Sequence, residues 1–260
     1  MNDGNYWLNY LLTLALIIGV GIGYFAFAYR WMYDYAIKLH PTKVFPPGNK
    51  LVLTNPNWHG NLAPQELTCV VLGDSSSSGQ GADDQTGCYS YQFLRDHLLT
   101  KYSHIYIYNL GESGAKTADV LDRQVPLALN LAPDLIMMAM GGNDLIQSYD
   151  RRIFAQNYRS VLNQLQTLNK PIIVLNIPAF NCTPLLLEPI RTFLHWRAWY
   201  FNQALAQIAQ EFPCVQLVDI YSIQDDGVKD STIYFSDDRF HLSALGYGLW
   251  SAQIAKDVKL

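Results

Sequence analysis

The chain has 260 residues, of which 50% are hydrophobic, and its 22 acidic and 18 basic side chains give a formal net charge of -4. This length suffices for one well-packed domain with an appended segment, and a second full domain is not expected. No cluster of Lys and Arg is dense enough to predict nucleic acid as a partner. The four cysteines are widely spaced and form no C-x-x-C pair, so the sequence predicts neither a zinc site nor a disulfide framework.

The first 29 residues depart from the composition of a globular domain. No charged residue occurs between Asp3 and Arg30, and a helix over residues 6–28 would span roughly 30 Å or slightly more, about the thickness of a bilayer core. A cleaved signal peptide is the alternative, because Ala26-Phe27-Ala28 has the small-x-small form of a cleavage site. The length of the apolar run, and the absence of Lys and Arg before it, favour an uncleaved single-pass transmembrane anchor over residues 1–29.

Basic residues follow this predicted helix and do not precede it. Arg30, Lys38, Lys43 and Lys50 come after the apolar run, whereas only the amino terminus is basic before it. Lys and Arg are enriched on the cytoplasmic side of membrane helices, so this pattern favours a cytoplasmic location for the downstream domain. A periplasmic or extracellular location stays open.

Residues 30–66 mix charged residues with turn-forming ones. Pro46-Pro47-Gly48 and Asn55-Pro56-Asn57 are turn signals. Neither a helical nor a strand period is sustained between them. We expect this interval to be a tether between the membrane and the domain.

From residue 67 to 260, short apolar runs alternate with longer segments compatible with helices. Several runs are apolar at consecutive positions, as expected for parallel strands covered by helices on both faces. The sequence therefore predicts a flavodoxin-like three-layer α/β/α sandwich with a five-stranded parallel sheet. The predicted strands cover residues 67–72, 104–109, 135–140, 171–177 and 215–220, with helices beginning near residues 89, 117, 152 and 188 and a last helix over 243–256.

Polar segments, three of them containing glycine, follow four of the five predicted strands. Each segment alone is an acceptable turn or helix cap, and the first lacks the Gly-Lys-Ser/Thr that a phosphate-binding P-loop requires. In an open parallel sheet, however, the carboxyl ends of the strands share one rim, where ligands bind. The segments together would supply a nucleophile, N–H donors, an amide side chain and an acid–histidine pair, which predicts a catalytic site. They are Gly73-Asp74-Ser75-Ser76-Ser77-Ser78-Gly79-Gln80-Gly81, Asn109-Leu110-Gly111-Glu112-Ser113-Gly114, Gly141-Gly142-Asn143-Asp144 and Asp237-Asp238-Arg239-Phe240-His241.

These segments resemble the four conserved blocks of the SGNH/GDSL hydrolase family, in the family's order and over about residues 67–256. The resemblance implies that Ser75 is the nucleophile and that Asp238 and His241 are its catalytic partners. It also implies an oxyanion hole formed by Ser75, Gly114 and Asn143. Relatives often carry proline after the histidine, where this chain has Leu242; the departure affects only the expected stiffness of the local backbone.

The chemistry of these residue types is consistent with that assignment. A serine hydroxyl is a weak nucleophile until an imidazole removes its proton, and the imidazole needs an acceptor on its other nitrogen. Asp238 precedes His241 by one turn of chain and can supply that acceptor, while the carboxylate of Asp237 is expected to point elsewhere. This mechanism requires no metal and no organic cofactor. The remaining histidines lack an acid at a productive spacing after a strand; they are His40, His59, His97, His104 and His195.

The resemblance implies hydrolysis of carboxylic esters, with thioesters and lysophospholipids as further candidates, through an acyl-serine intermediate. The expected partners are a small-molecule or lipid ester and the membrane. An O-acetyl esterase or acetyl transferase of envelope carbohydrate is the enzymatic alternative, and a membrane-bound binding module with a silent hydrolase fold is the alternative outside enzymes. The aromatic and leucine-rich stretch over residues 180–200 is either a helix stripe facing the core or an apolar wall for an acyl chain. The sequence predicts no oligomeric state.

Overall fold

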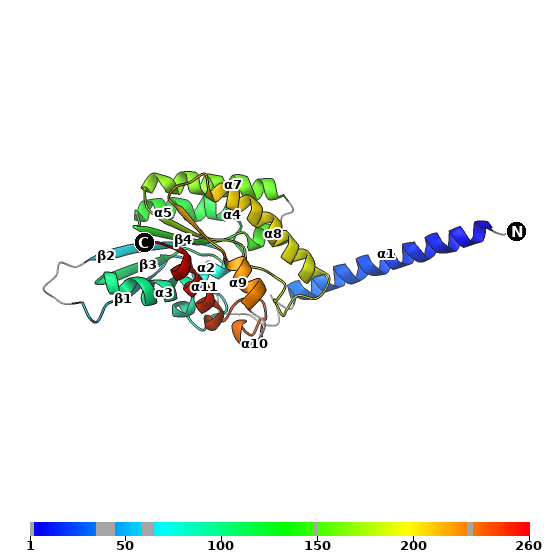
Figure 1. Cartoon of the computed structure of the whole chain (residues 1–260), viewed down its shortest axis with the longest axis horizontal. Helices are drawn as coiled ribbons and strands as arrows, with labels where there is room; N and C mark the ends of the chain where they lie inside the picture. The colour runs from blue at the N-terminus through cyan, green and yellow to red at the C-terminus, as the bar shows by residue number, and fades with distance from the viewer. Residues whose placement is uncertain (1–2, 35–44, 59–64, 148–149, 228–230) are drawn as a thin grey trace.

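The computed structural model describes residues 3–34, 45–58, 65–147, 150–227 and 231–260. Parts of the predicted tether, with Lys38, Lys43, His40 and His59, lie outside these ranges. Figure 1 shows a sheet with helices on both faces and a long N-terminal helix that projects from the domain.

The sheet has six strands in the order β1-β3-β2-β4-β5-β6. The last five strands along the chain pair in parallel, at the places where the sequence predicted them. The prediction of a five-stranded sheet is wrong in one respect, because a sixth strand, β1, pairs antiparallel with β3 at the sheet edge. The strands are β1 (Asn49–Thr54), β2 (Glu66–Gly73), β3 (His104–Asn109), β4 (Leu135–Ala139), β5 (Ile172–Leu175) and β6 (Val215–Val218).

Strand β1 lies in the interval expected to be an irregular tether. Its sequence, Asn-Lys-Leu-Val-Leu-Thr, buries Leu53 but leaves Val52 49% exposed. An edge strand with one buried face is recognised by alternating apolar and polar residues. The exposed Val52 between Leu51 and Leu53 interrupts this alternation. Pairing with β3, from Asn49 opposite Asn109 to Thr54 opposite His104, is a tertiary contact that the local sequence does not specify.

Two hydrophobic cores lie on the two faces of the sheet. Successive residues of β2 alternate between them: Val70 and Leu72 pack in one core, and Cys69 and Val71 in the other. The first core receives α5 (Val125–Leu131), α7 (Arg151–Leu165) and α8 (Ile190–Ala209), and the second receives α3 (Tyr89–Phe93), whose helical path continues to Leu98, and α11 (Ala244–Asp257). The remaining short helices are α2 (Ser75–Ser78), α4 (Thr117–Asp119), α6 (Gly142–Gln147), α9 (Ile220–Gly227) and α10 (Ser231–Tyr234).

The N-terminal helix α1 (Asp3–Asp34) is continuous through the predicted anchor. Among the described residues, its portion Tyr10–Met32 is the one helix long and apolar enough to cross a membrane, a property it shares with signal sequences. Most of its large side chains are exposed, but Ala28 and Met32 near its end are buried in the core shared with α7 and α8. The helix is therefore attached to the domain by packing as well as by the chain.

Buried amide side chains hold the carboxyl ends of the strands. Gln124 accepts a hydrogen bond from the N–H of Gly73 at 2.8 Å and donates to the carbonyl of the same residue at 2.9 Å. Beyond the end of β5, the side-chain amide of Asn202 likewise accepts from the N–H of Ile177 and donates to the carbonyl of the same residue. Backbone groups that leave a sheet in the interior need such partners, so these amides fix where the strands end and the functional loops begin.

Candidate active site

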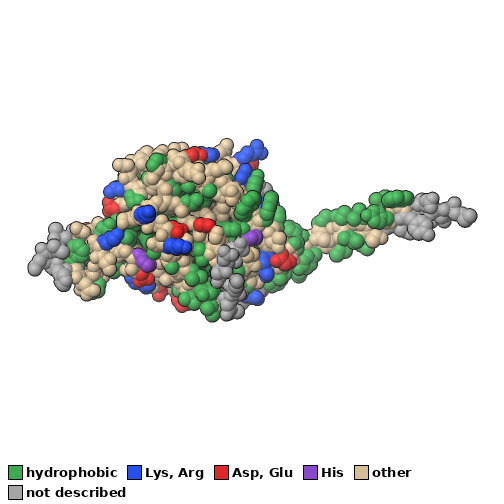
Figure 2. All heavy atoms as spheres, in the orientation of Figure 1, with side chains coloured by type: hydrophobic (Ala, Val, Ile, Leu, Met, Phe, Trp, Pro, Cys, Tyr) green, Lys and Arg blue, Asp and Glu red, His purple; other side chains and the backbone are tan. Residues whose placement is uncertain are grey.

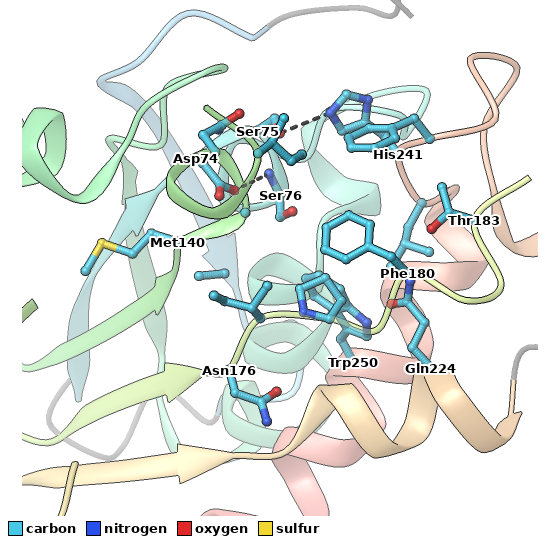
Figure 3. Close-up of a pocket in the computed structure, with 18 residues that line it drawn as sticks. Asp74, Ser75, Ser76, Met140, Asn176, Phe180, Thr183, Gln224, His241 and Trp250 are labelled. Atoms are coloured by element: carbon cyan, nitrogen blue, oxygen red, sulfur yellow. Dashed lines mark hydrogen bonds between the residues drawn. The ribbon is translucent and has the colours of Figure 1, made fainter. Parts of the chain in front are cut away.

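The loops that follow β2 and β4 meet the loop before α11 at one rim of the sheet. Asp74, Ser75, Asn143 and His241 line one pocket, so three of the four predicted segments meet there, while no residue of the segment 109–114 is among its lining residues. Figure 3 shows Ser75 and His241 side by side and joined by a hydrogen bond, with Phe180 and Trp250 among the other residues that line the pocket.

Ser75, His241 and Asp238 form a hydrogen-bonded chain. The Ser75 Oγ lies 3.0 Å from His241 Nε2, and His241 Nδ1 lies 2.5 Å from Asp238 Oδ2. An imidazole so held can take a proton from the hydroxyl with one nitrogen while the carboxylate fixes its tautomer through the other. The exposed neighbour Asp237 is not part of this chain of bonds.

The Asp238 carboxylate is fully buried and saturated with donors. Its Oδ1 accepts hydrogen bonds from Ser236 Oγ and from the backbone N–H groups of Phe240 and His241, each at 2.8 Å. Burial by itself raises the pKa of a carboxyl, but the bond from His241, its charge and the two backbone donors outweigh burial and bring the pKa of Asp238 below its ordinary value. The group is therefore ionised at neutral pH and able to stabilise an imidazolium.

The turn that carries Asp238 and His241 is closed on itself. The N–H of Ser236 donates to the carbonyl of His241 at 2.8 Å, and Phe235 forms a β-bridge with Leu242. Gly81 presses against this turn: a Cβ there would lie 2.4 Å from the Leu242 carbonyl oxygen and 2.8 Å from the His241 Cβ. Only glycine allows the β2–α3 loop to approach the histidine this closely, and its φ of +97° is also one that glycine favours.

Ser75 is positioned by the residues on either side of it. Asp74 caps α2 by accepting from the N–H of Ser76, and the buried Ser77 Oγ donates to the carbonyl of Leu72 at 2.7 Å. Ser77 Oγ also lies within hydrogen-bond distance of the N–H and the carbonyl of Ala139 on β4. Ser77 therefore ties the turn that carries Ser75 to two strands. The sequence did not indicate this role, because nothing distinguishes one serine of the Ser-Ser-Ser-Ser run from another.

Asn143 and Gly114, the other two predicted oxyanion residues, both adjoin Ala115. The side-chain amide of Asn143 donates to the Ala115 carbonyl at 3.1 Å. Gly114 precedes that residue, is exposed, and has a left-handed φ of +81°. Asn143 lines the pocket with Ser75, whereas Gly114 stands beyond the residues that line it.

Two buried carboxyls on the rim were not singled out from the sequence. Burial raises the pKa of Asp74 to about 6, against the lowering effect of the Ser76 N–H and the His241 charge. Burial likewise raises the pKa of Asp144, whose carboxylate accepts hydrogen bonds from the N–H and hydroxyl of Thr117. Asp74 is next to Ser75 and Asp144 is next to Asn143 in the sequence. Their burial depends on the tertiary fold, so the sequence did not show that they are buried acids.

The rest of the pocket is largely apolar. Ile146, Ile177, Phe180 and Phe240 line it beside the polar groups. The stretch over residues 180–200 divides between the two roles expected for it: Leu185, Leu186 and Leu194 are buried in the core, and Phe180 faces the pocket. Its remaining aromatics, Phe193, Trp196, Trp199 and Tyr200, are exposed, which neither expectation anticipated.

Neither cysteines nor other histidines build a second centre in the part of the chain that the structure describes. The four cysteines are free thiols, and no group of three or more His, Cys, Asp or Glu side chains there could hold a metal ion. His195 instead lies 3.0 Å from the Tyr221 hydroxyl through its Nε2 and stacks on that ring.

Comparison with known proteins identifies the family to which this chain belongs. Residues 71–249 match the GDSL-like Lipase/Acylhydrolase family. The chain belongs to this family. A curated relative, the GDSL esterase/lipase CPRD49 of Arabidopsis thaliana, is 25% identical over 166 residues, an alignment that covers 57% of this chain and 63% of the relative. The family assignment makes the protein an ester hydrolase of the SGNH/GDSL esterase/lipase type.

Solved structures share the fold. The lipase Lip_vut3 from a goat rumen metagenome superposes with a TM-score of 0.60 at 21% identity, covering 74% of this chain and 97% of its own. Axe2, an acetylxylan esterase from Geobacillus stearothermophilus, gives a TM-score of 0.59 at 20% identity, covering 75% of this chain and 94% of its own. At these identities the likeness establishes the mostly parallel α/β architecture of the GDSL hydrolases and not a shared substrate.

The hydrogen bonds of Asp238 predict its effect on turnover. Asp238→Asn should lower kcat roughly 1000-fold or more, because the amide cannot both accept from His241 Nδ1 and stabilise an imidazolium. Asp237→Asn, a matched change at the exposed neighbouring position, should change kcat by less than about twofold. Steady-state kinetics with circular dichroism on both variants make the comparison, and the reverse order of effects would assign the acid to Asp237.

The raised pKa of Asp74 predicts a pH-dependent stability. Because folding raises this pKa from 3.8 to about 6, the carboxyl contributes stability that is fully present below about pH 4 and is lost as the pH rises through 6. The loss is on the order of 3 kcal/mol. Asp74→Asn keeps the acceptor for Ser76 and removes the titration, so urea denaturation in detergent should show the variant gaining on the wild type between pH 4 and 7.5. Asp122→Asn, at an exposed position, is the control; a constant difference between wild type and Asp74→Asn would contradict the buried-acid interpretation.

Proposed function

We propose that this GDSL hydrolase cleaves carboxylic esters through an acyl intermediate on Ser75. The observation that supports this best is the 3.0 Å separation between Ser75 Oγ and His241 Nε2, with Asp238 bonded to the other nitrogen of the ring. That is the arrangement a hydroxyl needs in order to become a nucleophile at neutral pH.

The reaction proceeds in two halves. His241 Nε2 takes the Ser75 proton as Oγ bonds to the ester carbonyl carbon, and the resulting imidazolium gives that proton to the alcohol oxygen when the ester C–O bond breaks. The acyl group then remains on Ser75. His241 next takes a proton from water, whose oxygen attacks the acyl carbon, and returns a proton to Ser75 Oγ as the carboxylic acid leaves.

The oxyanion of each tetrahedral intermediate would be held by the N–H group of Ser75 and the side-chain amide of Asn143, which line the pocket. The family resemblance adds the N–H group of Gly114, which adjoins Ala115 next to Asn143 but stands outside the pocket lining. An amide nitrogen carries two N–H groups, and the bond from Asn143 to the Ala115 carbonyl orients the amide so that the second can reach a substrate oxygen in the pocket. Because this orientation exists before substrate arrives, little reorganisation is needed as negative charge develops.

The apolar wall of the pocket favours an ester with a hydrocarbon acyl chain. Ile146, Ile177 and Phe180 stand beside Ser75 and would remove such a chain from water. Thioesters and lysophospholipids carry acyl groups of the same kind and belong to the same proposal. An acetyl group on a carbohydrate, the substrate named for Axe2, would leave this wall largely unused.

We further propose that α1 is an uncleaved single-pass membrane anchor. Cleavage after Ala28 would cut inside a continuous helix and next to a residue that is 1% exposed in the domain core. Tyr29, the next residue, donates from its hydroxyl to the Ile146 carbonyl at 3.4 Å. Arg30 and Lys50 follow the uncharged stretch of α1, which favours a cytoplasmic domain.

A substrate panel tests the proposed activity. The full chain in detergent should hydrolyse p-nitrophenyl esters, with kcat/KM rising from acetate to octanoate because of the apolar wall, and Ser75→Ala should lose nearly all turnover with an unchanged fold. Preference for an acetylated xylo-oligosaccharide over every p-nitrophenyl ester would support the carbohydrate esterase instead. Equal turnover by Ser75→Ala would contradict the nucleophile.

Asn143 tests the oxyanion hole, because its side chain does not react. Asn143→Ala should lower kcat roughly 100- to 1000-fold with little change in KM, since the contact strengthens only as the carbonyl oxygen gains charge. Asn143→Asp should be at least as impaired, because it places negative charge where the oxyanion forms. An asparagine with only a structural role would behave differently. Its substitution would lower the melting temperature and leave kcat nearly unchanged, and aspartate would be tolerated.

Membrane association has its own expected outcome. Full-length protein should remain with membranes after washing in high salt and alkaline carbonate, since more than about 20 apolar residues cannot be left in water. Release of uncleaved protein, or a mature amino terminus at Tyr29, would contradict the anchor.

A further inference from the structure

Four large aromatic side chains of α8 face away from the domain. Phe193 is 37% exposed, Trp196 56%, Trp199 46% and Tyr200 38%. Trp196 and Tyr200 stack on each other, with ring centroids 5.7 Å apart and planes within 2°. We refer to these four residues as the aromatic face. Contiguous exposed apolar surface of this kind on a soluble domain marks a contact with something else.

The aromatic face is continuous with the exposed surface of α1. Phe25 of α1 meets Phe193 edge to face, with ring centroids 6.1 Å apart. Figure 2 shows the hydrophobic side chains gathered on the side of the domain from which α1 projects and continuing along that helix. Whatever surrounds the exposed residues of α1 therefore also borders the N-terminal part of α8.

The length of α1 sets how close the domain comes to a bilayer. Exposed apolar residues run from Trp7 to Phe27, which is roughly 30 Å of helix and matches the hydrocarbon thickness of a membrane. The following turn, with Ala28 and Met32, is already buried in the domain. No free segment separates the two, so a bilayer that covers α1 reaches the level of Phe25 and Phe193.

The chemistry of the aromatic face suits the headgroup region. Trp and Tyr prefer the membrane–water interface, and arginine can sit there with its charge directed to water. The Arg151 guanidinium lies 3.9 Å above the centre of the Tyr200 ring and donates to the Tyr200 carbonyl. The contact of Phe193 with Phe25 of α1 therefore favours the bilayer, rather than a protein partner or a second copy of the chain, as the occupant of this face.

The pocket lies at the same end of the domain. The parallel strands direct their carboxyl ends toward the side from which α1 leaves, as Figure 1 shows for β2. Ile146, which accepts the hydrogen bond from Tyr29 of α1, also lines the pocket. One residue, Ile146, thus contacts α1 through its backbone carbonyl and also lines the pocket that holds Ser75.

We propose that the aromatic face inserts into the headgroup layer of the bilayer that α1 crosses, so that the pocket opens at the membrane surface and receives esters held in the membrane. The inference rests on the proposed anchor and deepens the proposed esterase function. The aromatic face, rather than α1 alone, then fixes the tilt of the domain on the membrane.

Quenching of tryptophan fluorescence tests the insertion directly. The full chain is placed in phosphatidylcholine vesicles that contain lipids brominated either near the headgroup or near the chain end. The signal of Trp196 and Trp199 is obtained by difference from the Trp196→Phe/Trp199→Phe variant, because the chain has six tryptophans. The difference signal should be quenched severalfold more by the shallow bromines than by aqueous acrylamide. The matched control adds Leu127→Trp, on α5 and 52% exposed, to the double Phe variant; its added signal should respond to acrylamide and not to lipid.

Kinetics test the consequence for substrate access. Trp196→Ser/Trp199→Ser should lower turnover of a long-chain ester embedded in vesicles by roughly tenfold, while turnover of water-soluble p-nitrophenyl acetate stays unchanged; Leu127→Ser should alter neither. Equal loss on both substrates would indicate a folding defect or a role in the site and would overturn the proposal.

The two measurements distinguish failure of the proposed insertion from failure of the proposed esterase function. Acrylamide quenching without lipid quenching overturns the insertion even if esters are hydrolysed. Protection from acrylamide that depends on protein concentration and not on lipid assigns the face to a second copy and also overturns it. Lipid quenching in a chain without esterase activity supports the insertion while the proposed function fails.

Discussion

The geometry of the candidate active site depends on one buried charge, the carboxylate of Asp238. A carboxylate removed from water is costly unless donors replace the water, and here the Ser236 hydroxyl, two backbone N–H groups and the His241 ring do so. These donors all come from residues 236–241, so satisfying the charge also folds the turn. The position of the His241 ring is a consequence of that folding, and the Ser75 hydroxyl meets the ring from the opposite side of the pocket.

The opposite side must be equally well defined for a 3.0 Å contact to form between segments 166 residues apart. Gln124 clamps both backbone groups of Gly73, and Ser77 bonds the strands on either side of the turn. Gly81 then lets the loop after α2 touch the histidine turn directly. The hydrogen bonds that satisfy the backbone at the ends of β2 and β4 therefore support the geometry that the proposed catalytic chemistry requires.

The sequence predicted the parallel strands because several of them are apolar on both faces. It pointed to the candidate site because the segments after four of the five predicted strands carry a reactive or donor group. It did not predict β1, whose pairing depends on β3. It also gave no sign of Gln124 and Asp74 as buried polar groups, because burial is decided by tertiary packing and not by neighbouring residues. The exposed aromatic face of α8 was not predicted for the same reason. From the sequence alone Trp196 and Trp199 look like core residues, and only the packing of the helix shows that they are exposed.

The fold, the N-terminal helix and the pocket together describe a GDSL hydrolase whose candidate site stands at the end of the domain nearest α1. The central chemical claim is that Ser75 carries the acyl group between the two halves of the reaction. Rapid mixing of the full chain with p-nitrophenyl butyrate, followed by acid quenching and peptide mass spectrometry, measures this directly. We predict a burst of p-nitrophenol matching the enzyme concentration and a butyryl group on the peptide containing Ser75. Turnover with that peptide unmodified, or with the acyl group on another residue, would contradict the account.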